Sequence, residues 1–366
     1  MSLLNRKLSI FGAYGGVNLG DEMILRAAIN LANAQGYKKQ INIVVGHEPN
    51  KKSLERDYLE NNLKLISYRK PLALLKSVIG RDLFIGGGQV IDGVGGVKLP
   101  LLQSMLALVS KLSGGNVYVL GSSTARLSEW HVRLLYWCLF SLCSKIELRD
   151  NGSAEQVAEI APSCKKKIGV TADLVFSIKD QIAGEKARNN RKLIIFAPHH
   201  APKLQLTPID ESVRFLKRLN KAVGPDFDIA ILVHDVRPEF DYEFAQKLIA
   251  LVDVPNLKLI VPETTDSLIS YYQETYTIVS MRMHPIIIGV CAEAFCVPLK
   301  GSRKQKDLAE RLNIQSHSLS ELNSMTQEEF NVAIGLNADA ELAAGAILDQ
   351  FESDALKGFN CPKMND

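Results

Sequence analysis

The chain has 366 residues, of which 46% are hydrophobic and 23% are charged. At about 150 residues per domain this length predicts two domains, and the composition excludes disorder over most of the chain because it allows a sizeable core. Lysine and arginine number 43 against 40 aspartates and glutamates, a net charge of +3. This balance argues against a general nucleic-acid binder, which carries a clustered basic excess.

No segment has the character of a membrane span or a secretion signal. The most apolar runs, 99–112 and 134–143, are shorter than the roughly 20 residues that cross a bilayer. The N-terminus lacks the basic start and long apolar core of a secretory signal. Six cysteines stand at positions 138, 143, 164, 291, 296 and 361 without any C-x2-C pair, so no structural zinc is expected. We expect reduced thiols in a cytoplasmic protein.

In chain order, short apolar runs alternate with amphipathic ones. The first half predicts strands at 7–13, 41–46, 63–67, 82–85, 116–120 and 145–148, and helices at 22–35, 100–112 and 129–142. The polar stretch 179–192 is the best linker candidate. The second half predicts strands at 193–197, 228–233, 257–261, 277–280 and, more weakly, 295–299, and a terminal amphipathic helix from about 326 to 351.

This alternation is typical of βαβ units and predicts an α/β fold with parallel sheets. We expect two doubly wound, Rossmann-like domains, 1–180 and 181–325, that face each other across a cleft, followed by a C-terminal helix and tail, 326–366. Ligands of such sheets bind beyond the carboxyl ends of the strands, so the loops that follow strands are where the chemistry is expected.

A glycine-rich loop follows the first predicted strand. Its glycines do not have the spacing of the dinucleotide fingerprint; Gly15 to Gly20 matches a P-loop, but Asp21 and Glu22 stand where Lys and Ser or Thr are required. Two carboxylates would repel a phosphate and are suited to hydrogen bonds with sugar hydroxyls. Alternatively, Asn18 or Asp21 only caps the following helix.

Three glycines, Gly86, Gly87 and Gly88, follow the strand predicted at 82–85, and Asp92 comes soon after. Successive glycines allow a ligand to approach the backbone, whose N–H groups could contact an acceptor or an anion. The alternative is close packing of a helix on the strand.

Two charged residues follow later strands of the first half. Arg149 follows the strand predicted at 145–148 and could reach a cleft, or it could form a surface ion pair with Asp150 that has little energetic consequence. Asp173 could be a turn or cap residue. The residues alone leave both questions open.

Histidines gather after the strands of the second half, at His199, His200, His234 and His284. In a parallel sheet these positions lie along one edge. A metal site is one interpretation, although the spacing follows no known ligand motif, and acid–base catalysis is the other. If the backbone stays extended, Arg282 and His284 point to the same side. A fixed cation beside a proton donor would suit an anionic substrate that must be protonated.

A basic run opens the helix predicted to end at Leu312. Lys300, Arg303, Lys304 and Lys306 lie near its N-terminus, where the helix dipole favours an anion. A solvated basic face is the alternative.

The ordered motifs GGVNLGDE (15–22), FIGGGQVID (84–92), ELRD (147–150), TAD (171–173) and SMRMH (280–284) resemble the polysaccharide pyruvyl transferase family. The resemblance covers about residues 8–313, and NLGDE and SMRMH are its most specific parts. It implies a two-domain fold like that of the GT-B glycosyltransferases. It further implies transfer of pyruvate from phosphoenolpyruvate to a sugar diol in exopolysaccharide or cell-wall polysaccharide synthesis, with formation of a cyclic ketal and without a cofactor.

The resemblance also implies roles for individual residues. It assigns Arg149, Arg282 and His284 to the donor, together with a lysine that matches Lys304 or Lys306. Our own hypothesis is that His284 is the acid that donates the proton. We expect the first domain to bind the acceptor and the second to bind the donor. The expected acceptor residues are Asn18, Asp21, Glu22, Gly87, Gly88 and Asp92, and the further donor residues are His199, His200 and His234. The sequence departs from the family in having Pro285 where alanine is usual.

Two other functions stay open. A GT-B glycosyltransferase that uses a nucleotide sugar would need an acidic ribose contact, for which Glu263 is a candidate. A non-catalytic binding subunit of a polysaccharide assembly complex would bind ligand without turnover. The acceptor sugar, its linkage to a lipid and the oligomeric state are also open. With a lipid-linked acceptor, the helices at 99–112 or 129–142 could touch the inner face of the membrane, although core packing explains their apolar residues better.

Overall fold

The computed structural model describes residues 7–15, 17–37, 40–45, 63–184, 190–201, 207–255, 257–336 and 345–359. The chain divides into two compact units. Unit 1 consists of Met1–Gly16, Asp21–Ile178 and Gln350–Asp366, and unit 2 consists of Val17–Gly20 and Lys179–Asp349. The short segment Val17–Gly20 therefore belongs to unit 2, although both of its flanking segments belong to unit 1.

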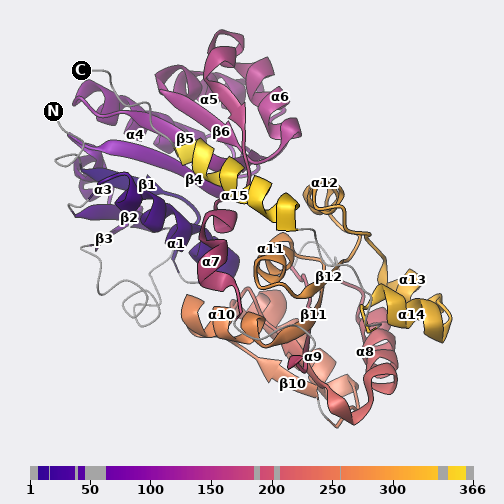
Figure 1. Cartoon of the computed structure of the whole chain (residues 1–366). Helices are drawn as coiled ribbons and strands as arrows, with labels where there is room; N and C mark the ends of the chain where they lie inside the picture. The colour runs from indigo at the N-terminus through magenta and orange to yellow at the C-terminus, as the bar shows by residue number, and fades with distance from the viewer. Residues whose placement is uncertain are drawn as a thin grey trace. The chain divides into compact units, whose positions relative to one another are not determined.

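Unit 1 is built on a seven-stranded parallel sheet in the order β3-β2-β1-β4-β5-β6-β7 (Figure 1). Its strands are β1 (Leu8–Phe11), β2 (Ile41–Val45), β3 (Leu63–Ser67), β4 (Asp82–Ile91), β5 (Val117–Thr124), β6 (Lys145–Leu148) and β7 (Ile168–Val170). The helices around it are α1 (Leu19–Ala34), α3 (Pro71–Val78), α4 (Lys98–Leu112), α5 (Trp130–Leu142), α6 (Asn151–Ile160) and the end of α15 (Gly345–Phe359), with 3-10 turns at Pro162–Lys167 and Leu174–Ile178.

Unit 2 has a five-stranded parallel sheet in the order β10-β9-β8-β11-β12. Its strands are β8 (Leu193–Ala197), β9 (Asp228–Leu232), β10 (Leu257–Ile260), β11 (Thr275–Ser280) and β12 (Phe295–Pro298). Its helices are α7 (Lys179–Ile182), α8 (Ile209–Val223), α9 (Glu243–Leu251), α10 (Thr265–Gln273), α11 (Met283–Cys291), α12 (Arg303–Arg311), α13 (Leu319–Ser324) and α14 (Gln327–Ala333), with a 3-10 turn at Gly224–Asp226 and a π turn at Pro238–Tyr242.

Both sheets are doubly wound and reverse their strand order at a central pair, β1 and β4 in unit 1 and β8 and β11 in unit 2. The predicted α/β class is thus confirmed. A ligand of such a sheet binds beyond the carboxyl ends of the two strands where the order reverses. These two edges decide where a site can form in each unit.

The strands β4 and β5 both extend beyond their predicted ends. A loop was expected from Gly86, but β4 runs on to Ile91 with Gly86, Gly87 and Gly88 inside it. Only glycine fits here, because a Cβ at Gly86 would lie 2.1 Å from the carbonyl oxygen of Leu120 on β5, and Gly87 and Gly88 have φ of 74° and 68°. The glycines thus allow the strand pairing to continue.

Three other elements also differ. The three-residue strand β7 was not predicted, and α7 lies inside the stretch predicted to be a linker, of which 185–189 are outside the described residues. The terminal helix predicted at 326–351 is wrong as a single element, because α14 ends at Ala333 and α15 begins at Gly345. Gly335, with φ of 71°, follows the first of these helices as a C-terminal glycine commonly does.

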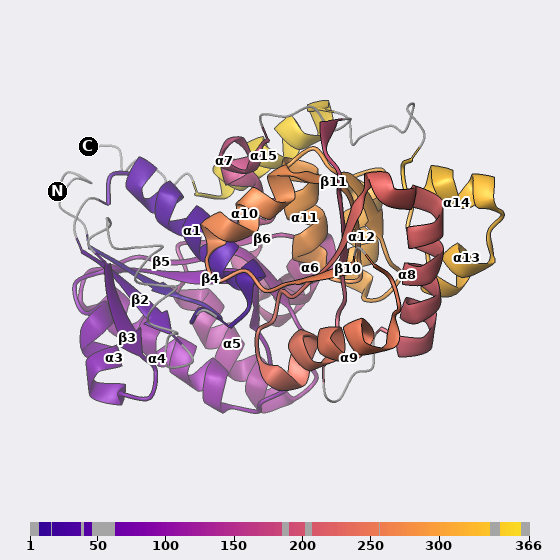
Figure 2. The same cartoon turned by 90° about the horizontal axis from the view of Figure 1, so that it is seen from below.

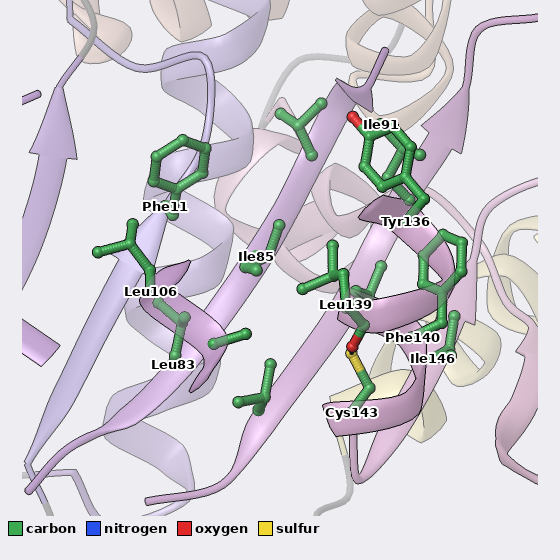
Figure 3. Packing of buried hydrophobic residues seen from close by; sticks show 14 of the residues in the cluster. Phe11, Leu83, Ile85, Ile91, Leu106, Tyr136, Leu139, Phe140, Cys143 and Ile146 are labelled. Atoms are coloured by element: carbon green, nitrogen blue, oxygen red, sulfur yellow. The ribbon is translucent and has the colours of Figure 1, made fainter. Parts of the chain in front are cut away.

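The core of unit 1 lies between the sheet and the layer formed by α3, α4 and α5, which occupy one side of the sheet while α1 occupies the other (Figure 2). Figure 3 shows the inward side of α5, with Tyr136, Leu139 and Phe140 packed beside Ile85 and Ile91 of β4. Phe140 is fully buried, so replacing it with alanine is expected to cost about 3–5 kcal/mol.

Two expectations about the whole chain can be compared with the structure. Cys138, Cys143, Cys164, Cys291 and Cys296 are free thiols, and Cys361 lies outside the described residues. Among the helices that the structure describes, none combines the length and the apolar character needed to cross a bilayer.

Candidate functional site

The carboxyl edge of the second sheet brings together the histidines and the arginine singled out in the sequence. His199 and His200 follow β8, and His234 follows β9. Arg282 is the N-cap of α11, with extended backbone, and His284 lies in the first turn of that helix. The condition of an extended backbone, under which both side chains would point to the same side, is therefore not met. A proline is tolerated in a first helical turn, where its missing N–H would have no partner, which explains Pro285.

A buried carboxylate holds Arg282. One terminal nitrogen of the guanidinium donates to Oδ1 of Asp241 at 2.8 Å, and Nε lies 2.7 Å from Oδ2. Asp241 is fully buried and also accepts the backbone N–H groups of His200 at 3.0 Å and Asp235 at 3.1 Å. Burial raises the pKa of the Asp241 carboxyl, and the charge of Arg282 opposes that rise. The guanidinium is thus fixed in direction at the edge of the sheet.

Asp241 is the main functional candidate that sequence reasoning missed. It lies in the π turn Pro238–Tyr242, in which Phe240 departs from helical geometry with φ of −102° and ψ of −132°. No motif marks it, and its only signal is its position shortly after His234 and Asp235, which follow the strand predicted at 228–233.

The three other histidines differ in environment. Burial and the charge of Arg282 lower the pKa of His199 to about 3, so its imidazole is neutral at pH 7. His200 stacks on Phe244 with ring centroids 5.1 Å apart. His234 is buried, its Nε2 lies 2.7 Å from the Tyr272 hydroxyl, and burial holds its pKa well below the usual range. Fixed positive charge at this edge therefore comes from Arg282 and not from His199 or His234.

The segment Val17–Gly20 completes this edge. The N–H of Leu19 donates to the carbonyl of His234 at 2.9 Å, and the N–H of Val236 donates to the carbonyl of Val17 at 2.9 Å. Gly20 lies against His284, because a Cβ at Gly20 would be 2.4 Å from Nδ1 of the imidazole. The glycine of the NLGDE motif thus makes room for the ring of the SMRMH motif.

Asn18 belongs to this segment and so to unit 2, whereas it was expected on the acceptor side with the first domain. Its side-chain oxygen accepts the N–H of Gly20 at 3.1 Å at the start of α1. This is the capping alternative considered for the loop.

The predicted lysines lie at the start of α12. Ser302 caps this helix by accepting the N–H of Gln305 at 3.3 Å. Lys304 is half-buried, while Lys306 is exposed and lies 3.7 Å from Glu310. Gln305, between them, is buried and donates to the carbonyl of Ser280 at 2.7 Å, which ties the first turn of α12 to the end of β11.

The corresponding edge of the first sheet has a different chemistry. Tyr14, fully buried, donates from its hydroxyl to the carbonyl of Gly86 at 2.6 Å, and Glu22 accepts the N–H of Gly15 at 2.8 Å. Burial, with the nearby charges of Asp21, Glu22 and Asp173, raises the pKa of Tyr14 well above its usual range. This edge is therefore a cluster of carboxylates around a neutral phenol.

The predicted acceptor residues are brought together only in part. A Cβ at Gly88 would lie 2.9 Å from a carboxylate oxygen of Asp21, and one at Gly87 would lie 2.8 Å from the Tyr14 hydroxyl. Gly87 thus lies against Tyr14, Gly88 lies against Asp21, and the charges of Asp21 and Glu22 act on the Tyr14 hydroxyl. Asp92 is not part of this group, since it lies beyond the end of β4 and its carboxylate accepts the N–H of Val94 at 2.7 Å in a turn.

Arg149 is buried in unit 1 and does not pair with Asp150. It donates to Asp173 at 2.6 Å and to the Ser123 hydroxyl at 3.0 Å. Asp150 instead caps α6 by accepting the N–H of Ser153 at 2.7 Å. The expected donor residues are therefore divided, with Arg149 in unit 1 and Arg282 and His284 in unit 2.

Within the described ranges, no group of three or more histidine, cysteine, aspartate or glutamate residues is arranged to hold a metal ion.

Solved structures similar to this chain share its fold. The UDP-GlcNAc 2-epimerase of Neisseria meningitidis bound to UDP-GlcNAc has 14% identity and a TM-score of 0.63, over 96% of this chain and 97% of that one. S. aureus MnaA with UDP has 11% identity and a TM-score of 0.60, over 96% and 92%. Anabaena Alr3699/HepE with UDP and glucose has 10% identity and a TM-score of 0.57, over 97% and 96%. At these identities the likeness shows the fold alone, and that fold is GT-B-like.

Sequence comparison is more specific. Comparison with curated proteins gives no match. The model of the family described as polysaccharide pyruvyl transferase matches residues 18–299, which include both parts of the unit 2 edge, Asn18–Gly20 and Arg282–His284. With more than half of its length matched, the chain belongs to the polysaccharide pyruvyl transferase family.

Proposed function

We propose that this protein transfers pyruvate from phosphoenolpyruvate to a sugar diol of a polysaccharide or its precursor. The products are a cyclic pyruvate ketal and phosphate. The observation that carries the proposal is the Arg282–Asp241 pair beside His284 at the carboxyl edge of the second sheet, in a chain of this family. The free thiols support a cytoplasmic location for the reaction.

The donor has a carboxylate and a phosphate, so its site needs fixed cations. The contacts of Arg282 to Asp241 use Nε and one terminal nitrogen, and a guanidinium has five N–H donors, so further donors remain to hold an anion. Arginine suits this task because its planar donors match carboxylate and phosphate oxygens in pairs. The first turn of α12, with Lys304 and Lys306, is the proposed source of a further cation, and the resemblance of the RD motif assigns Arg149 to the donor as well.

His284 is the proposed acid. Protonation of the methylene carbon of phosphoenolpyruvate leaves a cation at the carbon that bears the phosphate, and the first sugar hydroxyl adds there. Phosphate then leaves and the second hydroxyl closes the ring. Two hydroxyl protons are released. One returns to His284, which gave its proton to the new methyl group, and the other leaves with phosphate, so the reaction balances. Acid catalysis of this kind is worth about 10²–10⁴-fold in rate.

The proposed acceptor residues are those around Tyr14 in unit 1. The carboxylates of Asp21 and Glu22 can accept hydrogen bonds from sugar hydroxyls, and Gly87 and Gly88 leave room for a ring close to the backbone.

The test that does not depend on the unknown acceptor is thermal unfolding with phosphoenolpyruvate, UDP, GDP or NADH. A ligand at about 100 times its Kd stabilises a protein by about 2.7 kcal/mol. We expect a rise in unfolding temperature with phosphoenolpyruvate alone, lost in Arg282→Ala and retained in Arg214→Ala, a control at an exposed arginine. A rise with UDP or GDP instead would favour the alternative function, a glycosyltransferase that uses a nucleotide sugar.

A further inference from the structure

The helices α4 and α5 pack side by side on the first sheet and have apolar residues on both of their sides. Their inward residues form the core shown in Figure 3, including Leu106 of α4 and Leu139 of α5. Their outward sides are also apolar. We name this outer surface the α4–α5 face; its exposed residues are Leu101, Met105, Leu108 and Leu112 of α4 and Trp130, Leu134 and Trp137 of α5.

The spacing shows that these are two continuous stripes. Positions 101, 105, 108 and 112, and positions 130, 134 and 137, each recur at the three- and four-residue intervals that place side chains on one side of a helix. Leu112 is 79% exposed and Trp130 is 75% exposed. A helix that is apolar on all sides is normally buried in a core or in a membrane. The outward stripes therefore indicate a surface that a binding partner covers.

The charged residues of α4 are all positive. The exposed positions of α4 hold the four apolar residues above and two lysines, Lys98 and Lys111, one near each end of the helix. These lysines are about 20 Å apart along the helix axis. Neither α4 nor α5 contains an aspartate or a glutamate.

Two acidic residues lie beside α5. Glu159 lies 2.7 Å from Arg133, and Glu129 lies 2.9 Å from His131, which balances its charge only when the imidazole is protonated. Even with Glu129 counted as uncompensated, Lys98 and Lys111 leave an excess of positive charge. The α4–α5 face therefore combines apolar stripes with a net positive charge.

We propose that the α4–α5 face binds to the surface of an anionic lipid bilayer. Leucine, methionine and tryptophan side chains would enter the boundary between headgroups and acyl chains, as they do in helices that lie in the membrane plane. Tryptophan suits that boundary because its ring is apolar and its N–H is polar. Lys98 and Lys111 can extend their charged ends to anionic headgroups while their alkyl stems stay on the apolar surface.

A second copy of the chain fits this face less well. A twofold contact would place the α4–α5 face against itself. It would bring lysines toward lysines, with no carboxylate of either helix to compensate them. Anionic headgroups supply the missing countercharge. This inference goes beyond the proposed function, since it concerns a surface on α4 and α5 and none of the residues proposed to act on the donor.

The chain provides its own probe, because Trp130 and Trp137 are its only tryptophans and both lie on this face. We would titrate the full chain with vesicles of phosphatidylcholine mixed with an equal part of phosphatidylglycerol, and with vesicles of phosphatidylcholine alone. With the anionic vesicles we expect sedimentation with the lipid, a shift of tryptophan emission to shorter wavelength and protection from acrylamide quenching. Added salt should weaken this binding.

Two variants test which side chains are responsible. Lys98→Gln/Lys111→Gln should weaken binding to the anionic vesicles about thirtyfold, from about 1 kcal/mol per lysine at a membrane surface. Leu108→Ser/Leu134→Ser should abolish the shift in emission. The matched control Leu251→Ser/Val332→Ser changes two equally exposed apolar residues of unit 2 and should bind as the wild type does.

Absence of binding by the wild type, or equal binding by Leu108→Ser/Leu134→Ser, would overturn the proposal. So would concentration-dependent dimerisation that Leu108→Ser/Leu134→Ser removes while vesicles have no effect, because the face would then join two copies. The phosphoenolpyruvate-dependent rise in unfolding temperature is measured without lipid, so failure of one proposal leaves the other to be judged by itself.

Discussion

The two sheets have the same strand order around the reversal, with three strands on one side, β3-β2-β1 in unit 1 and β10-β9-β8 in unit 2, and the remainder on the other. The chemistry of their carboxyl edges differs. The edge of unit 2 has an arginine fixed by a buried aspartate and imidazoles around it. The edge of unit 1 has Asp21, Glu22 and Asp173 around the buried Tyr14, and its arginine, Arg149, is paired with Asp173. The topology determines where a ligand can lie in each unit, and the side chains determine which ligand it is. The comparison favours an anionic donor at the edge of unit 2 and a hydroxyl-bearing acceptor at the edge of unit 1.

The largest expected effect tests the proposed acid. His284→Ala should lower kcat about 10²–10⁴-fold, because general acid catalysis contributes that much. The phosphoenolpyruvate-dependent rise in unfolding temperature should remain, since Arg282 still binds the anion. The measurement is phosphate release with a soluble sugar acceptor, and His131→Ala, a histidine of α5, is the control that should keep its rate. An unchanged kcat in His284→Ala would remove this residue from the mechanism.

The second prediction concerns the pair that fixes Arg282. Asp241→Asn should lower the free energy of unfolding by about 3 kcal/mol, because it leaves a nearly buried guanidinium without its counterion. The matched control is Asp228→Asn, which removes the partner of Lys258 in an exposed pair and should cost less than about 1 kcal/mol. Urea unfolding of both variants measures the difference. Equal costs would mean that the buried pair does not stabilise the edge of unit 2.

A third prediction follows from the low pKa of His199. In the folded protein its pKa is about 3, against about 6.5 in the unfolded chain. Between these values the unfolded chain binds a proton that the native protein does not, so stability is retained above pH 6.5 and declines as the pH falls toward 3. At pH 5 the loss is about 2 kcal/mol.

The variant His199→Gln should show a shallower decline, measured as the free energy of unfolding at pH 7 and at pH 5. If wild type and variant decline equally, His199 is not held neutral by its surroundings.

The smallest expected effect belongs to the edge of unit 1. Asp21→Asn should raise the KM for the sugar acceptor about tenfold, near the lower end of the roughly 1.5–3 kcal/mol that a hydrogen bond to a charged group contributes, because the amide keeps one acceptor oxygen. The rise in unfolding temperature with phosphoenolpyruvate should not change. Asp180→Asn, at an exposed position of α7, is the control. A loss of the phosphoenolpyruvate effect in Asp21→Asn would contradict the division between a donor edge and an acceptor edge.

Apart from β7, the strands could be predicted from the sequence because each is a short apolar run bounded by polar residues, and β3, β6 and β8 have the predicted bounds. The errors occur where a residue's conformation depends on a distant neighbour. Gly86 continues a strand because β5 lies close to it, and His284 lies in the first turn of a helix, whereas the sequence left open whether the backbone stays extended there. Asp241 could not be predicted, since its importance comes from a contact with Arg282, 41 residues away.

The segment Val17–Gly20 limits how this protein can be divided. A fragment that begins at Lys179 would contain most of unit 2 but would lack the backbone partners of His234 and Val236 and the glycine against His284. Exchange of halves between relatives at a single crossover near 178 would therefore combine an NLG segment from one parent with an SMRMH segment from the other. A functional chimera therefore needs the NLG and SMRMH segments to come from the same parent. The two segments form one structural unit although more than 250 residues separate them in the chain.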